Sequence, residues 1–543
     1  MFVSAFRRRL VTTALVALAG FAAWGSAQAA NTYYVRVDGG SAAQCTGRAD
    51  APYPGSGTNK ACAWKSPHVA LPAAGVPRIA GGDTLIIGPG QYMIGWGATG
   101  AAGGRCYGDA PYDCYLAPVP SGPSWTARTR ILGKSTAGKC TAAPQLWGTQ
   151  RVAKVLNLEG SSNVEVGCLE ITDHSNCVES HVNPKIACHR ESAPYGAWAS
   201  VGVSASASKT AWLHDLNIHG LANRGIMAGG LTNWTVDRTK IVANGWGGWD
   251  GDIGTGSSNS GYIKLRGVEV AWNGCGQVWT TGGIHSCWAQ QEGGYGDGLG
   301  TGKTGGAWLV EDSYFHHNTS DGLDLLYLNG AASTSVTIRR TMANGNAGNQ
   351  LKTMGNATIE NSVVVGNCAY FNGRYNMSMG DQCRAEGNAL SVGLAPGTTA
   401  NIRHNTVTGQ GDCLILTSGG DASSKVFIQN NALIGKLDFL ANANGNVGEM
   451  SCGHYADNST APVSYTGNLF YAVKSNQCPA GGGNLCNVAP KLANLQLTTF
   501  DATPLVGSPL IDKAPVLATV PQDFVLAPRP SGTRSDIGAY EAQ

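Results

Sequence analysis

Residues 296–301 read GDGLGT, and the same order of Gly or Ser, Asp or Asn, a small or polar residue and Leu returns four times. The further copies are SDGLDL (320–325), GNQLKT (348–353), GNALSV (387–392) and GDCLIL (411–416). They follow one another at 24, 28, 39 and 24 residues. Repeats of this length are typical of solenoids, in which each copy is the same strand on a successive coil. The pattern therefore predicts that equivalent polar side chains stack in columns.

A second repeat, of alternating apolar and polar residues around an Asn or another polar corner, supports the same architecture. Examples are WTVDRTKIVANG (234–245), WLVEDSYFHHN (308–318) and ATIENSVVVGN (357–367). Alternation with a period of two indicates strands. We therefore expect an all-β solenoid, with long inserts near 246–261, 274–295 and 368–386 on one side, where binding sites usually lie.

The first 29 residues have the composition of a secretory signal. Three arginines at 7–9 precede an apolar run at 10–24, and AQA (27–29) is a small-x-small cleavage site. The run is too short for a transmembrane helix, so we expect a secreted protein, extracellular or periplasmic, with no membrane span. Loss of the three arginines leaves 34 basic and 35 acidic residues, a net charge of −1. This charge argues against nucleic-acid binding through a positive surface.

The 16 cysteines all follow the signal, and their even number favours disulfides over zinc or thiol chemistry in an exported protein. Short spacings suggest six pairs that clasp inserts: Cys45–Cys62, Cys106–Cys114, Cys177–Cys188, Cys275–Cys287, Cys368–Cys383 and Cys478–Cys486. The connectivity stays open, because spacing alone does not fix it. We expect almost no free thiol, with Cys413 as the exception.

Two phrases mark the ends of the mature chain. NTYYVRVDGG (31–40) is followed by GGDTLIIGPGQY (81–92), and DFVLAPRPSGTRSDIGAYE (523–541) stands at the other end. They resemble the opening and closing segments of many secreted bacterial right-handed parallel β-helix proteins. The resemblance implies one single-stranded right-handed parallel β-helix over 30–543, which we also expect to be a monomer. Its parts would be a cap with the first coils (30–160), central coils with active-site inserts (161–475) and a closing segment (476–543).

Two columns of the central coils carry the polar residues of interest. The first predicted column contains Asp297, Asp321, Asn349, Asn388 and Asp412, and the second, three residues along, contains Gly300, Asp324, Lys352, Ser391 and Ile415. With Leu323 and Leu325 turned inward, Asp324 faces outward beside Lys352. Carboxylates on adjacent coils repel unless a cation joins them, and calcium accepts several oxygen ligands. The clustering therefore argues for a metal.

Residues 296–353 resemble polysaccharide lyase family 9, the calcium-dependent pectate lyases and their relatives, in which DGF-type, DDGxD and GFKLGG-type coils follow one another. The counterparts here are DGL (297–299), SDGLD (320–324) and the stretch from NGN (344–346) to NQLK (349–352). The resemblance implies calcium held by Asp297, Asp321 and Asp324, with Lys352 as the base. Ser320 stands where the family has a further Asp, and Asn349, Gln350 and Thr353 replace glycines around the lysine.

These features predict β-elimination in an acidic, uronic-acid-containing polysaccharide. Calcium binding to the substrate carboxylate would acidify the C5 proton, which neutral Lys352 removes while the C4 glycosidic bond breaks. A nearby divalent cation and partial burial would lower the pKa of the lysine. We expect Lys303, Asn349, Asn388 and Trp288 to bind substrate.

Other interpretations remain open. The Asp and Asn columns are also typical of structural ladders, and Lys352 would balance Asp324 as a cross-strand ion pair. Trp246, Trp249, Trp279 and Trp288 lie in Gly-rich inserts, where they would stack on sugars, and Asp250 or Asp252 would add a metal ligand. A hydrolase or epimerase is one alternative, although hydrolases need two suitably spaced carboxylates and the Gly-His-Gly phrase of β-helix polygalacturonases is absent. A non-catalytic glycan-binding or surface protein is the other.

Overall fold

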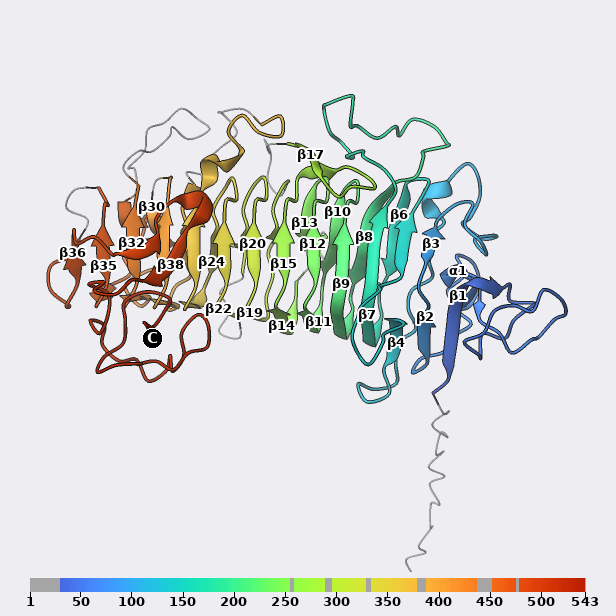
Figure 1. Ribbon diagram of the computed structural model, residues 1–543, viewed down its shortest axis with the longest axis horizontal. Coiled ribbons are helices and arrows are strands. Elements are labelled where there is room, and N and C mark those ends of the chain that lie inside the picture. The colour runs from blue at the N-terminus through green and yellow to red at the C-terminus, as the bar shows by residue number, and fades with distance from the viewer. Residues whose placement is uncertain are drawn as a thin grey trace, which may run out of the picture.

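The chain folds as a right-handed parallel β-helix, in which each strand pairs in parallel with the equivalent strand of the next coil. The computed structural model describes residues 30–253, 258–288, 295–328, 334–377, 387–411, 413–436, 452–474 and 478–542. Figure 1 shows the coils stacked along the long axis, from β1 (Thr32–Gly40) at one end to β36 (Leu485–Cys486) at the other. The predicted signal segment, 1–29, lies outside the described residues.

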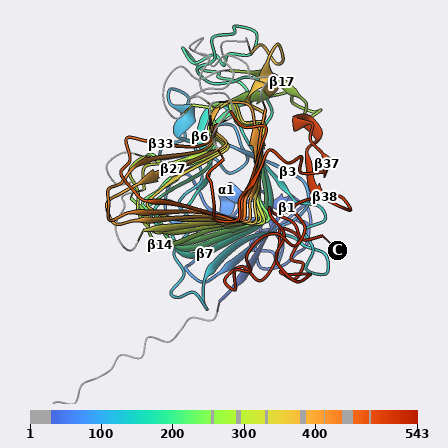
Figure 2. The same cartoon turned by 90° about the vertical axis from the view of Figure 1, so that its left-hand side faces the viewer.

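One face of the solenoid is a sheet of ten parallel strands, which carries both repeat columns. Its strands are β6 (Val152–Asn157), β8 (Ala199–Ser206), β10 (Arg224–Gly229), β13 (Gly247–Asp250), β18 (Leu299–Gly300), β21 (Leu323–Leu325), β24 (Leu351–Met354), β27 (Leu390–Leu394), β30 (Cys413–Gly419) and β33 (Cys452–Asp457). In the view along the axis, this sheet forms one side of the coil (Figure 2).

The other two faces belong to one sheet of 24 strands, because the long strands β7 (Ser162–Asp173) and β9 (Lys209–His219) run through both. One strip holds β1, β2 (Thr84–Ile87), β4 (Thr129–Gly133), β11 (Thr232–Asp237), β14 (Ser260–Arg266), β19 (Ala307–Glu311), β22 (Ser335–Arg339), β25 (Asn356–Glu360), β28 (Thr399–Arg403), β31 (Lys425–Gln429) and β34 (Val463–Thr466). The other holds β3 (Gln91–Ile94), β5 (Gln145–Gly148), β12 (Lys240–Val242), β15 (Glu269–Ala271), β20 (Tyr314–His316), β23 (Met342–Asn344), β26 (Val363–Gly366), β29 (Thr406–Gly409), β32 (Ala432–Gly435), β35 (Leu469–Tyr471) and β36.

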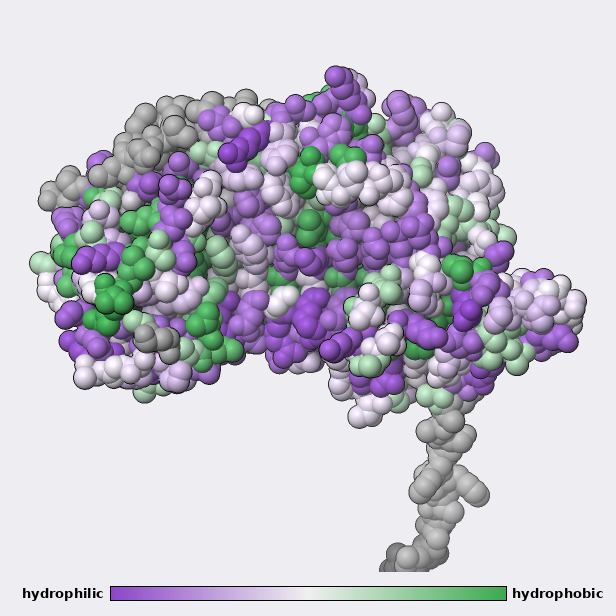
Figure 3. All heavy atoms as spheres, viewed as in Figure 1, coloured by the Kyte–Doolittle hydropathy of each residue, from purple (hydrophilic) through white to green (hydrophobic). Residues whose placement is uncertain are grey.

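The core fills the inside of the coil. Leu299, Leu323, Leu351 and Leu390 occupy equivalent inward positions on successive coils and are fully buried. Burial of one such side chain contributes about 1.5–3 kcal/mol. On the outside, hydrophilic side chains cover most of the middle of the molecule in the view of Figure 3. The alternation seen in the sequence thus separates core from surface on every coil.

Tryptophans contribute to this core, and one of them corrects a prediction. Trp234 lies in β11 and Trp308 in β19, and they are 0% and 3% exposed. Trp249, expected among the sugar-stacking candidates, is only 2% exposed, and its indole N–H donates to the carbonyl of Ala228 at 3.0 Å. Trp249 lies in strand β13, not in a loop, so its ring turns into the coil.

Strand register bears out most of the second predicted column. Gly300 pairs with Asp324, Asp324 with Lys352, and Lys352 with Ser391. The fifth copy is shifted by one residue, because Ser391 pairs with Leu416 and not with Ile415. In the first column the backbone N–H of Cys413 donates to Oδ1 of Asn388, so Cys413 takes the expected place of Asp412. Asp412 itself lies outside the described residues.

A buried amide ladder supports the turn that leads into the ten-stranded sheet. Asn244, Asn273, Asn318 and Asn346 stack on successive coils, and each donates through Nδ2 to Oδ1 of the next at 2.8–3.0 Å. All four are 0% exposed. The ladder satisfies buried polar groups that would otherwise be costly, and it fixes where each strand of the ten-stranded sheet begins.

Two of the three predicted inserts, near 274–295 and 368–386, lie on the turn that leads into the ten-stranded sheet, at the top of Figures 1 and 2. The prediction for 246–261 is wrong, because residues 247–250 form β13 and the turn after them leads from the ten-stranded sheet to β14, at another corner of the coil. Five of the six predicted disulfides are present, and the sixth, Cys368–Cys383, involves a residue outside the described part. Two further bridges are Cys140–Cys168 and Cys413–Cys452, so the expectation for Cys413 is wrong. Cys413 and Cys452 occupy paired positions on β30 and β33, which brings their sulfurs together.

The chain closes with a segment that returns onto the coils. Beyond the antiparallel pair β37 (Leu492–Asn494) and β38 (Asp501–Pro504), Arg529 and Glu541 form an ion pair of 2.8 Å with both side chains 0% exposed. The N–H of Ala539 donates to Oγ1 of Thr406 on β29 at 3.0 Å. Within the described residues no helix has the length and apolar character needed to cross a membrane.

Candidate functional site

Lys352 lies between two carboxylates on the outer side of the ten-stranded sheet. In-register pairing of β24 with β21 places it beside Asp324. Its Nζ donates to Oδ2 of Asp321 at 2.9 Å and to Oδ2 of Asp324 at 3.1 Å. The side chains of Lys352, Asp321 and Asp324 are 16%, 7% and 11% exposed. Such shielding makes the loss of one partner more costly than in a surface ion pair.

Asp297 and Asp321 also form a ladder with the backbone. Oδ1 of Asp297 accepts the N–H of Asp321 at 3.0 Å, and Oδ1 of Asp321 accepts the N–H of Asn349 at 2.6 Å. The other oxygen of Asp297 lies so close to Gly300 that a Cβ there would approach it to 2.9 Å. Glycine at position 300 therefore makes room for this carboxylate. The structural ladder that the sequence left open is present, and Asp321 serves it while also contacting Lys352.

Burial sets the protonation of the cluster. Burial, followed by the charges of Asp321 and Asp324, raises the pKa of Asp297 to about 7. Burial, followed by the charge of Asp321, raises the pKa of Asp324 to about 6. Burial lowers the pKa of Lys352, but the two neighbouring carboxylates outweigh it and leave this pKa above its usual value. The direction differs from the sequence expectation, which rested on a nearby cation.

The donor chemistry of the cluster suits calcium, although its present geometry pairs the carboxylates with lysine. Three carboxylates on adjacent coils supply oxygen ligands, and Oδ1 of Asn349 is buried without a hydrogen-bond partner. In the described part of the chain, no group of three or more His, Cys, Asp or Glu side chains is arranged to hold a metal ion. The Nζ of Lys352 already supplies positive charge between Asp321 and Asp324, so a calcium ion would compete with it.

The predicted substrate-binding residues lie at different depths. Asn349 and Asn388 are each 2% exposed and belong to the first column. Lys303 is exposed in the loop that follows β18. Trp288 is partly buried, and its ring meets that of Tyr295 edge-on at a centroid distance of 4.7 Å. Tyr295 precedes Asp297 by two residues, so Trp288 is brought to the edge of the site. Binding of substrate by these four residues stays a prediction.

The remaining candidates have protein partners. Asp250 forms an ion pair with Arg224, and the N–H of Asp252 donates to Oδ1 of Asp250 at 2.9 Å. The ring of Trp279 stacks on His174 at a centroid distance of 3.7 Å. Trp246 lies 5.2 Å from Tyr295, and its carbonyl accepts the N–H of Gly296. The backbone of Trp246 therefore lies beside the segment that leads to Asp297.

Comparisons with known proteins give distant similarities to solved structures. No family model matches the chain, and no curated protein matches its sequence. Among solved structures, the chain is similar to "pectate lyase Pel9A", with a TM-score of 0.45 and 14% identity over 94% of this chain and 96% of that one. The similarity to an alginate lyase from Paenibacillus sp. str. FPU-7 has a TM-score of 0.35 and 12% identity, and it covers 71% of this chain and 91% of that one. The similarity to the mannuronan C-5 epimerase AlgE4 A-module of Azotobacter vinelandii has a TM-score of 0.35 and 12% identity, and it covers 70% of this chain and 88% of that one.

The raised pKa of Asp297 predicts a specific dependence of stability on pH in metal-free protein. A folded-state pKa of about 7, well above the usual pKa of an aspartate, means that the folded state binds more protons than the unfolded state between these values. Stability should therefore fall as pH rises from about 4 to about 7. Asp297→Asn should remove the part of this fall that Asp297 contributes, and its stability should therefore depend less steeply on pH than that of the wild type.

Urea denaturation of both proteins at several pH values, with a chelator present, checks this prediction. Asp215→Asn is the matched control, because the pKa of Asp215 is lowered by its hydrogen bond to Arg238. Asp215→Asn should lower the free energy of unfolding at neutral pH. Above pH 5, this free energy should change with pH as it does in the wild type. Parallel curves for wild type and Asp297→Asn would contradict the assignment.

Proposed function

We propose that this protein is a secreted, calcium-dependent polysaccharide lyase that cleaves an acidic, uronic-acid-containing polysaccharide by β-elimination. One observation carries the proposal: Lys352 lies within 2.9 and 3.1 Å of two carboxylates on the outer side of a solenoid sheet. A base and a set of oxygen donors therefore share one surface. The disulfides are consistent with an oxidising compartment.

Lys352 would act as the base. Its neutral amine takes the C5 proton of the uronate, the C–H electrons form the C4=C5 double bond, and the C4–O bond breaks. The leaving oxygen then takes a proton from water. Calcium, when bound by Asp297, Asp321 and Asp324, would supply positive charge to the substrate carboxylate. Asp321 and Asp324 fix the position of the Lys352 Nζ. Their negative charges also keep this amine protonated as long as no cation offsets them.

A second candidate is a glycan-binding protein without catalysis. It is favoured by the raised pKa of Lys352, because a protonated amine cannot abstract a proton. In that case Lys352 would bind a sugar carboxylate as a fixed cation. The two candidates differ in their products, since only the lyase creates an unsaturated uronide.

The product assay separates the two. Polygalacturonate, alginate and a glycosaminoglycan would each be incubated with the protein and calcium from neutral to alkaline pH, with ultraviolet detection of unsaturated uronides. We expect one of these polymers to give a product whose absorbance grows with time. If none of the three polymers gives an unsaturated product, whether or not it binds, the lyase proposal fails. Heat-denatured protein is the control for spontaneous elimination at high pH.

A further inference from the structure

A group of arginines lies on the same ten-stranded sheet, towards the N-terminus from the carboxylates. Arg224 begins β10 and pairs with Gly247 of β13. By the register that pairs Trp249 with Leu299, Gly247 aligns with Asp297. Neighbouring strands are about 4.8 Å apart, so Arg224 lies about 10 Å from Asp297 along the solenoid axis. Any chain of sugars that crosses the carboxylates along this axis passes over Arg224 next.

Glu179 holds two further arginines at this place. Its Oε1 accepts from Nη2 of Arg151 at 3.2 Å and pairs with Nε of Arg190 at 3.5 Å. Its Oε2 accepts from Oγ of Ser200 at 2.8 Å and from Nδ2 of Asn223 at 3.1 Å. The Glu179 side chain is 6% exposed, whereas those of Arg151 and Arg190 are 31% and 34% exposed. A buried carboxylate thus fixes two guanidinium groups that reach the surface.

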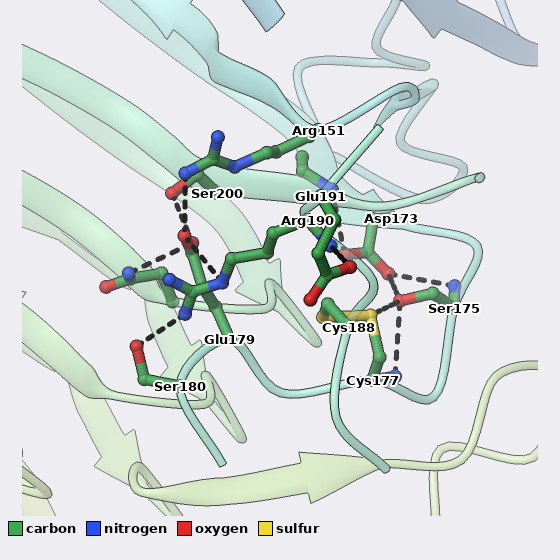
Figure 4. Close-up of a disulfide and its surroundings, with 12 residues drawn as sticks. Arg151, Asp173, Ser175, Cys177, Glu179, Ser180, Cys188, Arg190, Glu191 and Ser200 are labelled. Carbon is green, nitrogen blue, oxygen red and sulfur yellow. Dashed lines mark hydrogen bonds and ion pairs between the residues drawn. A yellow bond between two sulfur atoms is a disulfide. The ribbon is translucent and has the colours of Figure 1, made fainter. Parts of the chain in front are cut away.

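The Cys177–Cys188 disulfide sets this arrangement within the insert. Glu179 follows Cys177 by two residues, and Arg190 follows Cys188 by two, so the bridge brings both side chains to the same point. Figure 4 shows Glu179 between Arg151 and Arg190, with the disulfide beside the insert segment. The position of Arg190 therefore depends on a covalent link, although it lies in a loop.

Arg224 is fixed in a different way. Its Nε donates to Oδ2 of Asp250 at 2.5 Å, and its Nη1 donates to Oδ1 of Asn223 at 2.6 Å. The guanidinium lies over the ring of Trp246, 4.1 Å from the centroid. Stacking and two hydrogen bonds hold its plane, which preserves the fork geometry that suits a carboxylate.

These arginines have donors and charge to offer a ligand. A guanidinium has five N–H donors. Arg151 uses one in the contact with Glu179, and Arg224 uses two, to Asp250 and Asn223. Arg190 uses two, because its Nη2 also donates to Oγ of Ser180 at 2.5 Å. Glu179 and Asp250 hold the three guanidinium groups, and the exposed Glu191 lies beside Arg190, where its Oε2 accepts the backbone N–H of Arg190 at 3.0 Å. The aligned position between Arg224 and Asp297 is Gly247, which has no side chain. Along the column of Asp324, Gly300 follows Asp250, the residue that binds Arg224.

We propose that Arg151, Arg190 and Arg224 form an arginine platform that binds the carboxylates of uronic acid residues next to the one held at Asp297, Asp321, Asp324 and Lys352. This proposal rests on the proposed function, because it assigns the same polymer to the same sheet. The platform selects acidic over neutral sugars, and Arg224 is its specificity-determining residue because it stands nearest the carboxylate cluster.

The test is Arg224→Gln, with oligogalacturonate and oligoalginate as probes in calorimetric titrations with calcium. Carboxyl-reduced oligomers of the same length serve as neutral probes, and sulfated, carboxyl-free oligomers test for a general anion site. Arg224→Gln should weaken binding of the acidic oligomer about 10-fold or more, since hydrogen bonds to charged groups contribute about 1.5–3 kcal/mol. Binding of the reduced oligomer should be unchanged. In cleavage assays KM should rise with kcat nearly constant.

Arg266→Gln is the matched control, because Arg266 also binds a carboxylate, Asp237 at 2.8 Å, but lies on β14 of the other sheet. It should bind every probe as the wild type does. If Arg224→Gln unfolds, Arg190→Gln, in the exposed insert, should still weaken acidic binding by at least about threefold, roughly 0.7 kcal/mol.

Two results would overturn the platform: equal binding of acidic oligomers by wild type and the arginine variants, or equal loss for acidic and reduced oligomers. Preference for the sulfated probe would also overturn it, because the site would then read another anion. Binding that depends on Arg224 without any unsaturated product would support the platform and reject the lyase function, so the two failures are distinguishable.

Discussion

Replacing Lys352 with alanine should lower the rate of polymer cleavage about 100-fold to 10,000-fold, the range that general-base catalysis contributes. The fold should stay nearly unchanged, because Lys352 is an outward residue on a sheet whose core positions are filled by leucines. Removal of the ammonium leaves Asp321 and Asp324 without their shared partner, so some stability should be lost at neutral pH in metal-free protein. Rates should therefore be measured per folded molecule with calcium present.

A double variant separates catalysis from ion pairing. Lys352→Ala with Asp324→Asn removes both the ammonium and one of the carboxylates it balances, and it should regain stability while remaining inactive. Lys240→Ala is the matched control, because Lys240 pairs with Glu269 at 2.6 Å on the other sheet. It should keep wild-type activity. Cleavage by Lys352→Ala at a rate within a few-fold of wild type would assign the lysine a purely structural role.

The sequence predicted the fold and the neighbourhood of Lys352 because solenoid registers depend on local patterns. Leu299, Leu323, Leu351 and Leu390 must face inward on each coil, and a slip of one residue would turn them outward. Once the leucines are aligned, Asp324 and Lys352 are adjacent by geometry. The same reasoning failed for the fifth copy. The sequence pattern aligned Asp412 with Asn388, but in the structure Cys413 takes that place, since its N–H donates to Oδ1 of Asn388.

Contacts between residues far apart in the sequence could not be predicted in the same way. The pattern predicted that Lys352 lies beside Asp324, but it did not predict the hydrogen bond from its Nζ to Asp321 of the other column. Trp249 was assigned to a Gly-rich loop because its neighbours resemble loop residues. The arginines of the platform belong to no repeat, since Arg151, Arg190 and Arg224 meet only through Glu179, Asn223 and the insert clasped by Cys177–Cys188.

Removal of calcium should abolish cleavage and lower the melting temperature by several degrees. A ligand that binds only the folded state at 100 times its Kd stabilises that state by about 2.7 kcal/mol. A second effect acts on the base: Asp321 and Asp324 raise the pKa of Lys352 in the absence of metal. Balancing their charge should lower this pKa again. Calcium should therefore shift the ascending limb of the pH–rate profile of kcat/KM, which reports the deprotonation of Lys352, to lower pH.

Calcium titrations followed by thermal unfolding distinguish this account from a structural cluster. Asp297→Asn and Asp324→Asn should each reduce the calcium-induced rise in melting temperature, because each removes a charged ligand. Lys352→Ala should bind calcium at least as tightly as wild type, because its ammonium no longer competes for Asp321 and Asp324. Asp215→Asn, on the other sheet, should leave the rise unchanged.

If neither chelator nor added calcium changes the melting temperature or the activity of the wild-type protein, Lys352 stays protonated between its two carboxylates. The cluster would then be a binding surface for sugar carboxylates and not a centre for β-elimination.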